Sequence, residues 1–402
     1  MSSKKTNNIY KYAIVIIITA FITFVLTSIF VYHFINNDER YYVKNSKTEN
    51  SSLEQTLAYF KEILDKKYIG EINEEELKES AIKGYIAGLN DPYTEYFTKE
   101  EMQEFTEETE GEYVGIGIYT IADTSRNAIV VLRTIGDSPA SKAGLLTGDI
   151  ITKVDDEEFT GETLNEAVKK MKGVVGTTVK ITILRDDKEM EFNIKRENIK
   201  ISHVSSDVLD NDIGYIKISS FEGGCSEEFL EKYKEIEKQD IKSLIIDLRF
   251  NGGGIVDEAL NIAELMVPKD KILLITKDKT EEEEVIKSKT DPSINMQVVV
   301  LINEYSASAS EILAGILKED INATLIGTTT YGKGVIQTVY PLKDGSGLKI
   351  TTDEYYTPNH NKINQVGIDP TIKVELSEEL RQITNLPLEQ DLQLQKAIEE
   401  LK

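Results

Sequence analysis

Residues 303–337 read NEYSASASEILAGILKEDINATLIGTTTYGKGVIQ, and this stretch decides the fold of the region around it. The apolar run 298–302 before it is typical of a fully buried strand, and a helical spacing of apolar residues begins near Ser308. The pattern therefore predicts Ser308 at a strand-to-helix turn. The free N–H groups and the dipole of a helix favour negative charge at such a turn, which suits a nucleophile.

A lysine in the same stretch is the candidate base. A second apolar strand, 323–326, leads to Gly332-Lys333-Gly334, where the two glycines permit a tight backbone that aims the lysine. Neither His203 nor His360 lies in a recognisable site motif. Lysine is neutral near pH 7 only if its pKa falls by about three, which costs about 4 kcal/mol. Burial lowers a lysine pKa by as much as about 3–5, so an enclosed Lys333 meets this requirement.

Four residues after this lysine, Gln337 is placed to hold the amine through its side-chain carbonyl. Structural alternatives stay open at this point. Lys333 also fits an ordinary solvent-exposed loop lysine. The three serines of the stretch fit helix capping, a role that serine fills well; they are Ser306, Ser308 and Ser310.

A similar strand–loop–helix unit precedes this one. The strand 243–249 runs into Asn251-Gly252-Gly253-Gly254 and then into a helix over 256–266. Alternating strands and helices predict a largely parallel sheet, whose loops gather at one edge. Gly253 and Ser308 can then meet, and the amides of Gly253 and Ala309 are a candidate oxyanion hole. A phosphate-binding loop and a tight helix entry are the alternatives.

Residues 112–196 have a different pattern, with short alternating strands around glycine turns. The loop Gly115-Ile116-Gly117-Ile118, the turn at Gly148-Asp149 and a helix over 162–171 together resemble a bacterial PDZ domain. The resemblance implies that the loop offers backbone N–H groups to the terminal carboxylate of a peptide, which adds as a strand beside it. A small sheet domain with ordinary glycine turns is the alternative.

The amino-terminal part carries an uncharged apolar segment. Residues 12–35 are long enough for one transmembrane helix, and lysines before it with acidic residues after it predict a cytoplasmic amino terminus. This predicts a single-pass protein of the cell membrane with an extracytoplasmic catalytic part. A cleaved signal peptide is the rival interpretation, although no small-x-small site follows. Helices over 53–68 and 73–89 indicate a lead-in segment or a dimerisation arm, so a homodimer is a further expectation.

Composition excludes several classes of function. The 402 residues carry a net charge of −24, which argues against nucleic acid as a main ligand. One cysteine, Cys225, rules out an intrachain disulfide framework. The three histidines have no zinc-ligand spacing, so we expect no metal and no cofactor.

Several motifs resemble those of the carboxyl-terminal processing peptidases, also called tail-specific proteases. The resemblance covers about residues 53–376 and rests on Asp91-Pro-Tyr-x-x-Tyr96, Asp247-Leu-Arg249-x-Asn251-x-Gly253-Gly254, Asn303-x-x-Ser306-Ala-Ser308-Ala-Ser310-Glu311, Thr330-Tyr331-Gly332-Lys333-Gly334-x-x-Gln337 and Gly367-Ile-x-Pro370. It implies a serine endopeptidase with a Ser–Lys dyad: Ser308 as nucleophile, Lys333 as general base and Gln337 as its support. It also implies oxyanion donors at Gly253 and Ala309. Gly252 departs from the family, in which proline is common at that position.

These observations predict an α/β fold with a parallel-sheet serine peptidase core, an inserted PDZ domain, an N-terminal helical segment and a single transmembrane helix. The expected parts are a cytoplasmic tail (1–11), the transmembrane helix (12–35), a linker (36–52), the helical segment (53–105), the PDZ domain (106–197) and the peptidase core with a helical tail (198–402). We expect protein or peptide substrates with accessible C-termini. One alternative is a membrane-tethered PDZ module that binds tails without cutting them, and another, a nucleotide enzyme, lacks a Walker lysine motif.

Overall fold

The computed structural model describes residues 23–28 and 52–402. The chain divides into two compact units, Met1–Lys78 and Glu79–Lys402. In the first unit, helix α2 (Leu53–Lys67) begins at Ser52, whose side chain accepts the N–H of Gln55. Helix α3 (Glu74–Ala87) begins in this unit and continues into the second, and the side chain of Asn73 accepts the N–H of Glu76 at its start.

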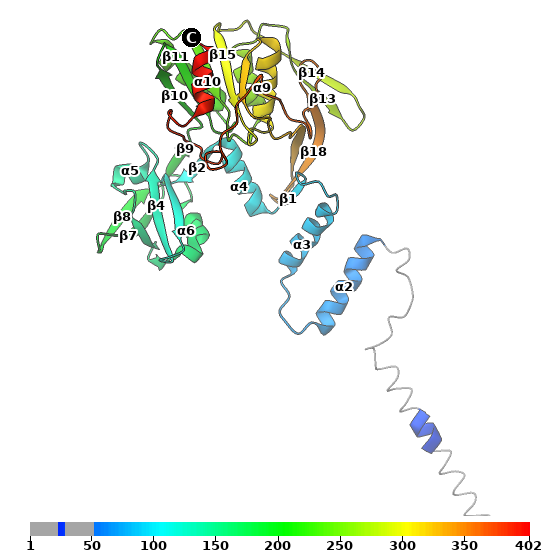
Figure 1. Cartoon of the computed structure of the whole chain (residues 1–402). Helices are drawn as coiled ribbons and strands as arrows, with labels where there is room; N and C mark the ends of the chain where they lie inside the picture. Colours follow the sequence, from blue (N-terminus) through cyan, green and yellow to red (C-terminus); the bar gives the residue numbers. More distant parts are fainter. Residues whose placement is uncertain (1–22, 29–51) are drawn as a thin grey trace, which may run out of the picture. The chain divides into compact units, whose positions relative to one another are not determined.

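The second unit is built on a six-stranded sheet in the order β10-β11-β12-β15-β16-β19 (Figure 1). All neighbouring pairs in it are parallel except β10 with β11. Its strands are β10 (Val204–Leu209), β11 (Ile213–Ile218), β12 (Ser243–Asp247), β15 (Gln297–Ile302), β16 (Thr324–Gly327) and β19 (Ile372–Lys373).

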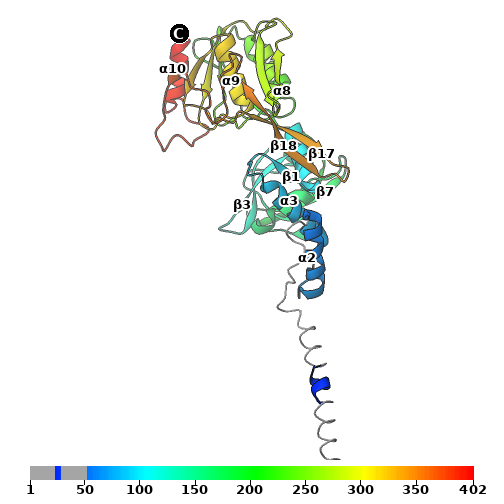
Figure 2. The same cartoon turned by 90° about the vertical axis from the view of Figure 1, so that its right-hand side faces the viewer.

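Both faces of this sheet are buried, which explains the continuous apolar runs of its central strands. Alternate residues of β15 point to opposite faces: Val298, Val300 and Ile302 join one core cluster, while Val299 and Leu301 join another. Helices α7 (Cys225–Glu237), α8 (Val256–Glu264) and α9 (Ala309–Asp320) supply buried residues to the first cluster. Helix α10 (Leu392–Glu400) covers the other face with Ala397 (Figure 2).

A second sheet is antiparallel throughout. Its order is β1-β18-β13-β14, and β17 also pairs with β18. The strands are β1 (Glu95–Phe97), β13 (Ile272–Asp278), β14 (Glu283–Lys287), β17 (Val335–Pro341) and β18 (Gly347–Tyr356); helix α4 (Lys99–Glu110) follows β1. β18 is long enough to pair with three different strands, β1, β13 and β17.

The region that resembles a PDZ domain has its own core and its own sheet. A two-stranded ladder, β2 with β9, carries the chain into and out of it, and its main sheet has the order β3-β4-β5-β7-β8 with β6 beside β5. The elements are β2 (Glu112–Gly115), β3 (Ile118–Asp123), β4 (Ala128–Thr134), α5 (Pro139–Ala143), β5 (Ile150–Val154), β6 (Glu157–Glu158), η2 (Gly161–Thr163), α6 (Leu164–Met171), β7 (Thr178–Arg185), β8 (Lys188–Lys195) and β9 (Glu197–Lys200).

The structure corrects the predicted sheet type and the predicted helical tail. Of the four sheets in the described residues, three are antiparallel and only the sheet containing β15 is mainly parallel, so a parallel-sheet description of the chain is wrong. The parallel prediction came from the two strand–loop–helix units, which lie in that one sheet. In addition, residues 375–402 are helical only over α10, although a mostly helical tail was expected.

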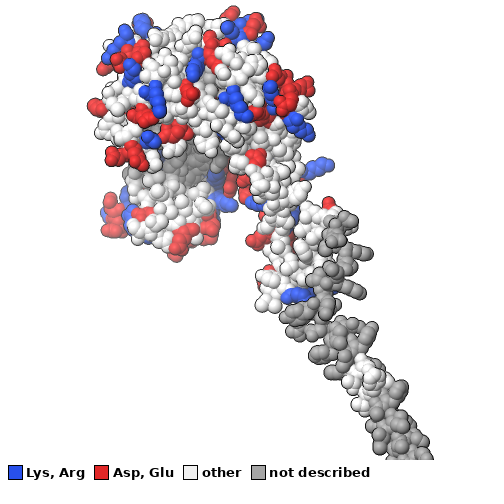
Figure 3. Space-filling model, turned by 45° about the vertical axis from the view of Figure 1, so that its right-hand side comes forward, with Lys and Arg blue, Asp and Glu red and all other residues white. Residues whose placement is uncertain are grey.

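The predicted transmembrane helix is also contradicted. Residues 12–35 lie mostly outside the described residues, and the described part of them, 23–28, is helical. Among described residues, no helix combines the length and the apolar character that a bilayer crossing requires. This finding contradicts the predicted single-pass membrane location. On the face drawn in Figure 3, acidic and basic side chains are interspersed over the described surface.

Candidate active site

Ser308 occupies a strained turn between β15 and α9. Its backbone angles, φ 55° and ψ −117°, belong to a region that side-chain-bearing residues rarely adopt. The neighbouring serines have structural roles: Ser306 Oγ donates to the carbonyl of Leu248 at 2.8 Å, and Ser310 Oγ to that of Asn251 at 2.9 Å. Of the three serines, Ser308 lines the large cleft of this unit.

The loop after β12 is fastened to the turn of Ser308 through backbone groups. The N–H of Ala307 donates to the carbonyl of Asn251 at 3.0 Å. The N–H of Phe250 donates to the side chain of Asn303 at 3.0 Å, and the rings of Phe250 and Tyr305 stack with centroids 5.4 Å apart. The carboxyl ends of two adjacent parallel strands therefore bring the glycine loop and the turn of Ser308 together, as the sequence predicted.

Gly253 packs directly behind the candidate nucleophile. Its φ is +108°, and a Cβ added there would lie 2.8 Å from the Cβ of Ser308 and 3.1 Å from the nitrogen of Ala309. The Gly253 N–H donates to the side-chain oxygen of Asn251 at 2.9 Å in this structure. The carbonyl of Ser308 accepts from the N–H groups of Glu311 and Ile312, so the trans peptide directs the N–H of Ala309 away from the helix body. Of the two predicted oxyanion donors, the N–H of Ala309 is therefore more available than that of Gly253, which already donates to Asn251.

The loop that carries Gly332, Lys333 and Gly334, called the lysine loop, follows β16 and packs against the turn of Ser308. Gly332 has φ +88°, and a Cβ on Gly334 would lie 2.2 Å from the nitrogen of Asn364, so neither position accommodates a side chain. The N–H of Tyr331 donates to the carbonyl of Ser306 at 3.0 Å. This bond fastens the lysine loop to the turn that carries Ser308.

Lys333 is half-buried in the cleft that Ser308 lines. Burial lowers the pKa of its amine below the ordinary value; Lys349 adds to that effect, while Glu311 and Asp91 oppose it. Its Nζ lies 4.6 Å from the centroid of the Tyr93 ring. No hydrogen bond or ion pair joins this Nζ to any side chain that the structure describes.

Gln337 lines the cleft as well, but it makes different contacts from those predicted. Its side-chain nitrogen donates to Thr351 Oγ1 at 3.3 Å and to the carbonyl of Val335 at 3.5 Å. Within the described part of the chain, no hydrogen bond joins Gln337 to Lys333. One cleft is thus lined by Ser308, Lys333 and Gln337, but no hydrogen bond joins their side chains in the described part of the chain.

Glu311 is a site residue that the sequence reasoning missed. Its fully buried carboxylate accepts the backbone N–H of Ser308 at 2.9 Å, of Lys333 at 2.9 Å and of Gly332 at 2.7 Å. Thr330 Oγ1 donates to it at 2.5 Å. Burial raises the pKa of Glu311, although these four donors act in the opposite direction. A glutamate three residues after a helix N-cap resembles a capping box, which was the available signal.

Tyr355 is the second residue that the reasoning missed. Its ring is fully buried, and its hydroxyl donates to the carbonyl of Lys333. Burial raises the pKa of Tyr355 far above its ordinary value, against a side-chain hydrogen bond with Ser308 that lowers it. Tyr355 is therefore a neutral phenol that lies next to both Ser308 and Lys333.

The cleft has room for an extended peptide. It encloses about 720 Å³. Its lining combines apolar side chains with polar ones, among them Ser308, Lys333 and the carboxylates of Glu110, Glu222 and Asp257. The apolar lining includes Met102, Phe105, Ile255, Val256, Val335, Ile336 and Val339.

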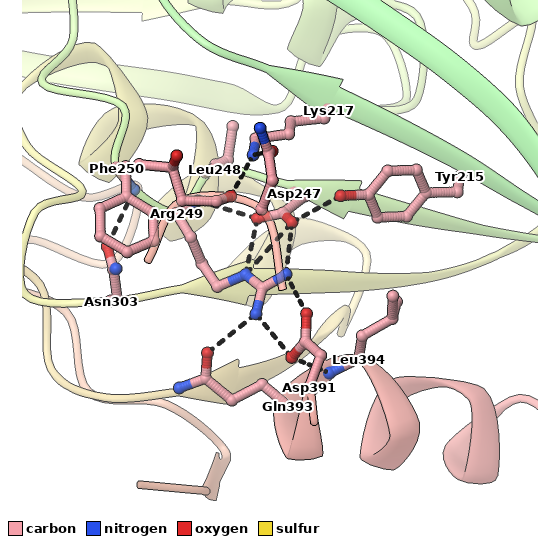
Figure 4. Close-up of polar contacts among 12 residues, drawn as sticks. Tyr215, Lys217, Asp247, Leu248, Arg249, Phe250, Asn303, Asp391, Gln393 and Leu394 are labelled. Atoms are coloured by element: carbon pink, nitrogen blue, oxygen red, sulfur yellow. Dashed lines mark hydrogen bonds and ion pairs between the residues drawn. The ribbon is translucent and has the colours of Figure 1, made fainter. Parts of the chain in front are cut away.

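A buried cluster of charges supports the glycine loop from behind (Figure 4). The guanidinium of Arg249 donates to both carboxylate oxygens of Asp247, at 2.7 to 3.1 Å, and to both oxygens of Asp391, at 2.8 Å each. Gln393 accepts a further bond at 3.1 Å. Burial acts to raise the pKa of Asp247, but the charge and hydrogen bonds of Arg249 outweigh it and hold this pKa below its ordinary value. The segment before α10 thus joins the residues that precede the glycine loop.

The second predicted site lies in the PDZ-like region. A groove of about 200 Å³ is lined by the predicted loop residues Gly115, Ile116, Gly117 and Ile118, and by Tyr113, Tyr119, Thr120, Val168, Met171 and Lys172. The carbonyl of Ile116 accepts the N–H of Ala140 at 2.9 Å, and that of Gly117 accepts the N–H of Ile135 at 3.0 Å. In trans peptides the following N–H groups, of Gly117 and Ile118, point the opposite way.

Known proteins resemble this chain both in the region of the Ser308 cleft and in the PDZ-like region. The sequence model described as "Peptidase family S41" matches residues 212–374, "PDZ domain" matches 113–195 and "Activating protease CtpB N-terminal domain" matches 16–101. The chain is 37% identical to a "Probable CtpA-like serine protease" of Staphylococcus haemolyticus, over 90% of this chain and 71% of the relative. It is 36% identical to a "Carboxy-terminal-processing protease" of Bartonella bacilliformis, over 79% and 75%. A putative S41 protease from Bacteroides fragilis shares its fold, with a TM-score of 0.51 at 16% identity, over 83% of this chain and 90% of that chain.

Proposed function

This chain belongs to the S41 family of carboxy-terminal-processing serine proteases and carries a PDZ domain, and on that premise we propose that Ser308 and Lys333 form its catalytic dyad. The observation that carries the proposal is their common cleft, in which both are held through the carboxylate of Glu311. A strained backbone at Ser308 and a lowered pKa at Lys333 support it, because such features gather at reacting groups.

The proposed reaction begins when a peptide occupies the cleft and Lys333 is neutral. The amine swings from the Tyr93 ring toward Ser308 and accepts the hydroxyl proton as the oxygen attacks the peptide carbonyl carbon. The oxygen of that carbonyl becomes an oxyanion and receives the N–H of Ala309. Gly253 supplies a second donor once its N–H turns from Asn251.

Collapse of the tetrahedral intermediate breaks the C–N bond, and Lys333 returns its proton to the departing amine. A water molecule then attacks the acyl ester, with Lys333 accepting its proton and passing it back to the oxygen of Ser308. Gln337 is proposed to orient the amine during these steps through its side-chain carbonyl. No step requires a metal or a cofactor.

The PDZ groove is proposed to receive the C-terminus of a protein substrate. The N–H groups of Gly117 and Ile118 are directed to a carboxylate, in a loop that Gly115 and Ile116 complete. Val168 and Met171 in the groove suit an apolar last side chain. Substrates with accessible, flexible tails follow from this arrangement. We retain the helical segment 53–105, the PDZ domain 106–197 and the peptidase core 198–402 as the proposed division, and the homodimer stays a prediction.

The test is cleavage of an unstructured polypeptide by the full-length chain. The substrate carries a fluorophore and a quencher on opposite sides of one segment, so that cutting raises fluorescence. Ser308→Ala and Lys333→Ala should each lower kcat by about 10⁴-fold or more, as for other nucleophile–base pairs. The exposed Ser293→Ala and Lys343→Ala are matched controls that should cut like the wild type.

An alternative keeps the PDZ domain and discards catalysis. The Lys333 amine faces Tyr93 and makes no bond to Ser308 in the described structure, which is what a non-catalytic tail-binding module would allow. Such a module binds a tail peptide but leaves it intact. Equal fluorescence traces for the wild type and Ser308→Ala would favour this module and overturn the dyad.

A further inference from the structure

Tyr93 provides the aromatic face that the Lys333 amine occupies. The centroid of its ring lies 4.6 Å from Nζ, within the range of a cation–π contact. Tyr93 belongs to the connection between α3 and β1, far from Lys333 in sequence. It also belongs to the Asp91-Pro-Tyr motif, to which the proposed mechanism assigns no role.

Hydrogen bonds fix the backbone turn that carries the ring. Asp91 accepts the N–H of Tyr93 at 3.1 Å and the hydroxyl proton of Thr94 at 2.6 Å. The hydroxyl oxygen of Thr94 accepts the N–H of Thr351 at 3.1 Å, which ties the turn to β18. β1 then continues along β18, where Glu95 is paired with Lys349. The position of the ring is therefore built into the sheet that also carries β17.

Lys333 contacts the Tyr93 ring directly, whereas the carboxylates of Glu311 and Asp91 stabilise its charge without forming an ion pair among the described residues. Glu311 faces it from α9, but both carboxylate oxygens already accept backbone or hydroxyl donors. Asp91 faces it from the Tyr93 turn and is likewise engaged, and Lys349 on β18 repels it. Tyr331, on the lysine loop, lies close to Tyr93, and Tyr355 on β18 donates its hydroxyl proton to the backbone carbonyl of Lys333. Among the described residues, no carboxylate forms an ion pair with Lys333.

We propose that the Tyr93 ring is the holding position of the protonated, idle Lys333, and that Tyr93 thereby sets the pH at which this base becomes available. The inference rests on the proposed dyad. An aromatic face attracts an ammonium ion but not a neutral amine. Loss of the proton to solvent removes that attraction, and the amine is then free to turn toward Ser308. Tyr93 is a positioning residue, because it acts through Lys333.

The ring of Tyr93 and its hydroxyl have different roles. Burial raises the pKa of Tyr93, with the neighbouring Tyr331 contributing in the same direction, so the phenol stays neutral. The holding role therefore belongs to the ring face, which phenylalanine also presents. Leucine fills comparable space without a π face, and this contrast defines the experiment.

The experiment measures kcat/KM against pH for the full-length wild type, Tyr93→Leu and Tyr93→Phe. Tyr93→Leu should move the acid limb to lower pH by about half a unit, which raises kcat/KM about threefold on that limb. Tyr93→Phe should keep the wild-type limb, and Tyr340→Leu, an exposed tyrosine on β17, is the control. A merely structural role would lower the rate at every pH without moving the limb.

A second measurement keeps the inference testable if the dyad proposal fails. Trace acetylation with acetic anhydride, followed by peptide mass spectrometry, reports the neutral fraction of Lys333 directly and requires no activity. The half-point should move down by the same amount in Tyr93→Leu and not in Tyr93→Phe. An unmoved or raised half-point in Tyr93→Leu, or an equal shift in both variants, would overturn the role of the ring. Thermal unfolding of each variant establishes that it is folded.

Discussion

Ser308 and Lys333 donate their backbone N–H groups to the same carboxylate oxygen, Oε2 of Glu311, each at 2.9 Å. The proposed nucleophile and the proposed base are therefore positioned relative to one another through a third residue, although their side chains make no bond. Because Glu311 is fully buried, water cannot replace either bond.

Replacing Glu311 should damage both stability and activity. Glu311→Gln turns one acceptor oxygen into a donor, which leaves at least one buried N–H without a partner at a cost of about 1–3 kcal/mol. We expect a lower free energy of unfolding and a kcat reduced by more than tenfold. Glu319→Gln, at the partly exposed end of α9, is the control and should retain activity. Denaturant titration and initial rates measure the two effects, and unchanged values in Glu311→Gln would refute this positioning role.

The rate should depend on pH through Lys333. Since burial and then Lys349 lower its pKa, the neutral amine appears at a lower pH than for an ordinary lysine. kcat/KM should therefore rise with pH, with a midpoint below about 10.4. Lys349→Gln removes a neighbouring positive charge, so the midpoint should move to higher pH. This direction is opposite to the one expected for Tyr93→Leu. A downward movement in Lys349→Gln would contradict the assignment.

Two adjacent glycines should differ sharply in their tolerance of a methyl group. Gly253→Ala places Cβ against Ser308 and strains a backbone of φ +108°, so the oxyanion site is distorted. We expect kcat to fall by about 10²–10³-fold, the usual effect of losing one oxyanion donor. At Gly252 a Cβ meets nothing within 4 Å, so Gly252→Ala should keep near wild-type rates. Equal effects in the two variants would remove Gly253 from the oxyanion site.

Asp391 should make a large contribution to the free energy of unfolding, although it lies just before the peripheral helix α10. Asp391→Asn removes a charge that faces the buried guanidinium of Arg249 but keeps the helix cap, and we expect a loss of about 1–3 kcal/mol. The exposed Glu389→Gln should change nothing measurable. Chemical denaturation compares the two, and a wild-type midpoint for Asp391→Asn would show that the ion pair is dispensable.

In the PDZ groove, Gly117→Ala should weaken tail binding. A Cβ there would lie 2.4 Å from the Cβ of Ser138 at φ +78°, so the loop cannot keep its shape. We expect the dissociation constant of a peptide with an apolar C-terminal residue to rise about tenfold, equivalent to about 1.4 kcal/mol. Gly136→Ala meets nothing within 4 Å and is the control. Equal affinities measured by fluorescence anisotropy would exclude this loop from binding.

Much of the site's framework was predictable because it depends on local patterns. The apolar run of β15, the start of α9 beside Ser308 and the glycines around Lys333 each follow from spacing or backbone requirements. Their meeting at one sheet edge follows from the parallel order of neighbouring strands.

The rest depends on contacts between distant residues. Arg249 and Asp391 are separated by 142 positions, and nothing local identifies them as partners. Glu311 resembles an ordinary cap, since its bonds to the lysine loop appear only when that loop folds against α9. The N–H of Gly253 was expected to be free, but Asn251, two residues earlier, supplies an acceptor. The antiparallel sheet that contains β18 escaped prediction because β18 pairs with strands from three separate regions.

The ion pair between Arg249 and Asp391 should also limit cleavage of the C-terminal segment by the protease itself. A protease cuts peptide segments that can adopt an extended conformation. The segment of α10 is instead helical, and its N-cap residue, Asp391, forms a buried ion pair with Arg249. Ala397 is fully buried against the main sheet, so releasing this segment would expose part of the core. Loss of the Asp391 carboxylate should therefore make the protease vulnerable to self-digestion before it unfolds as a whole.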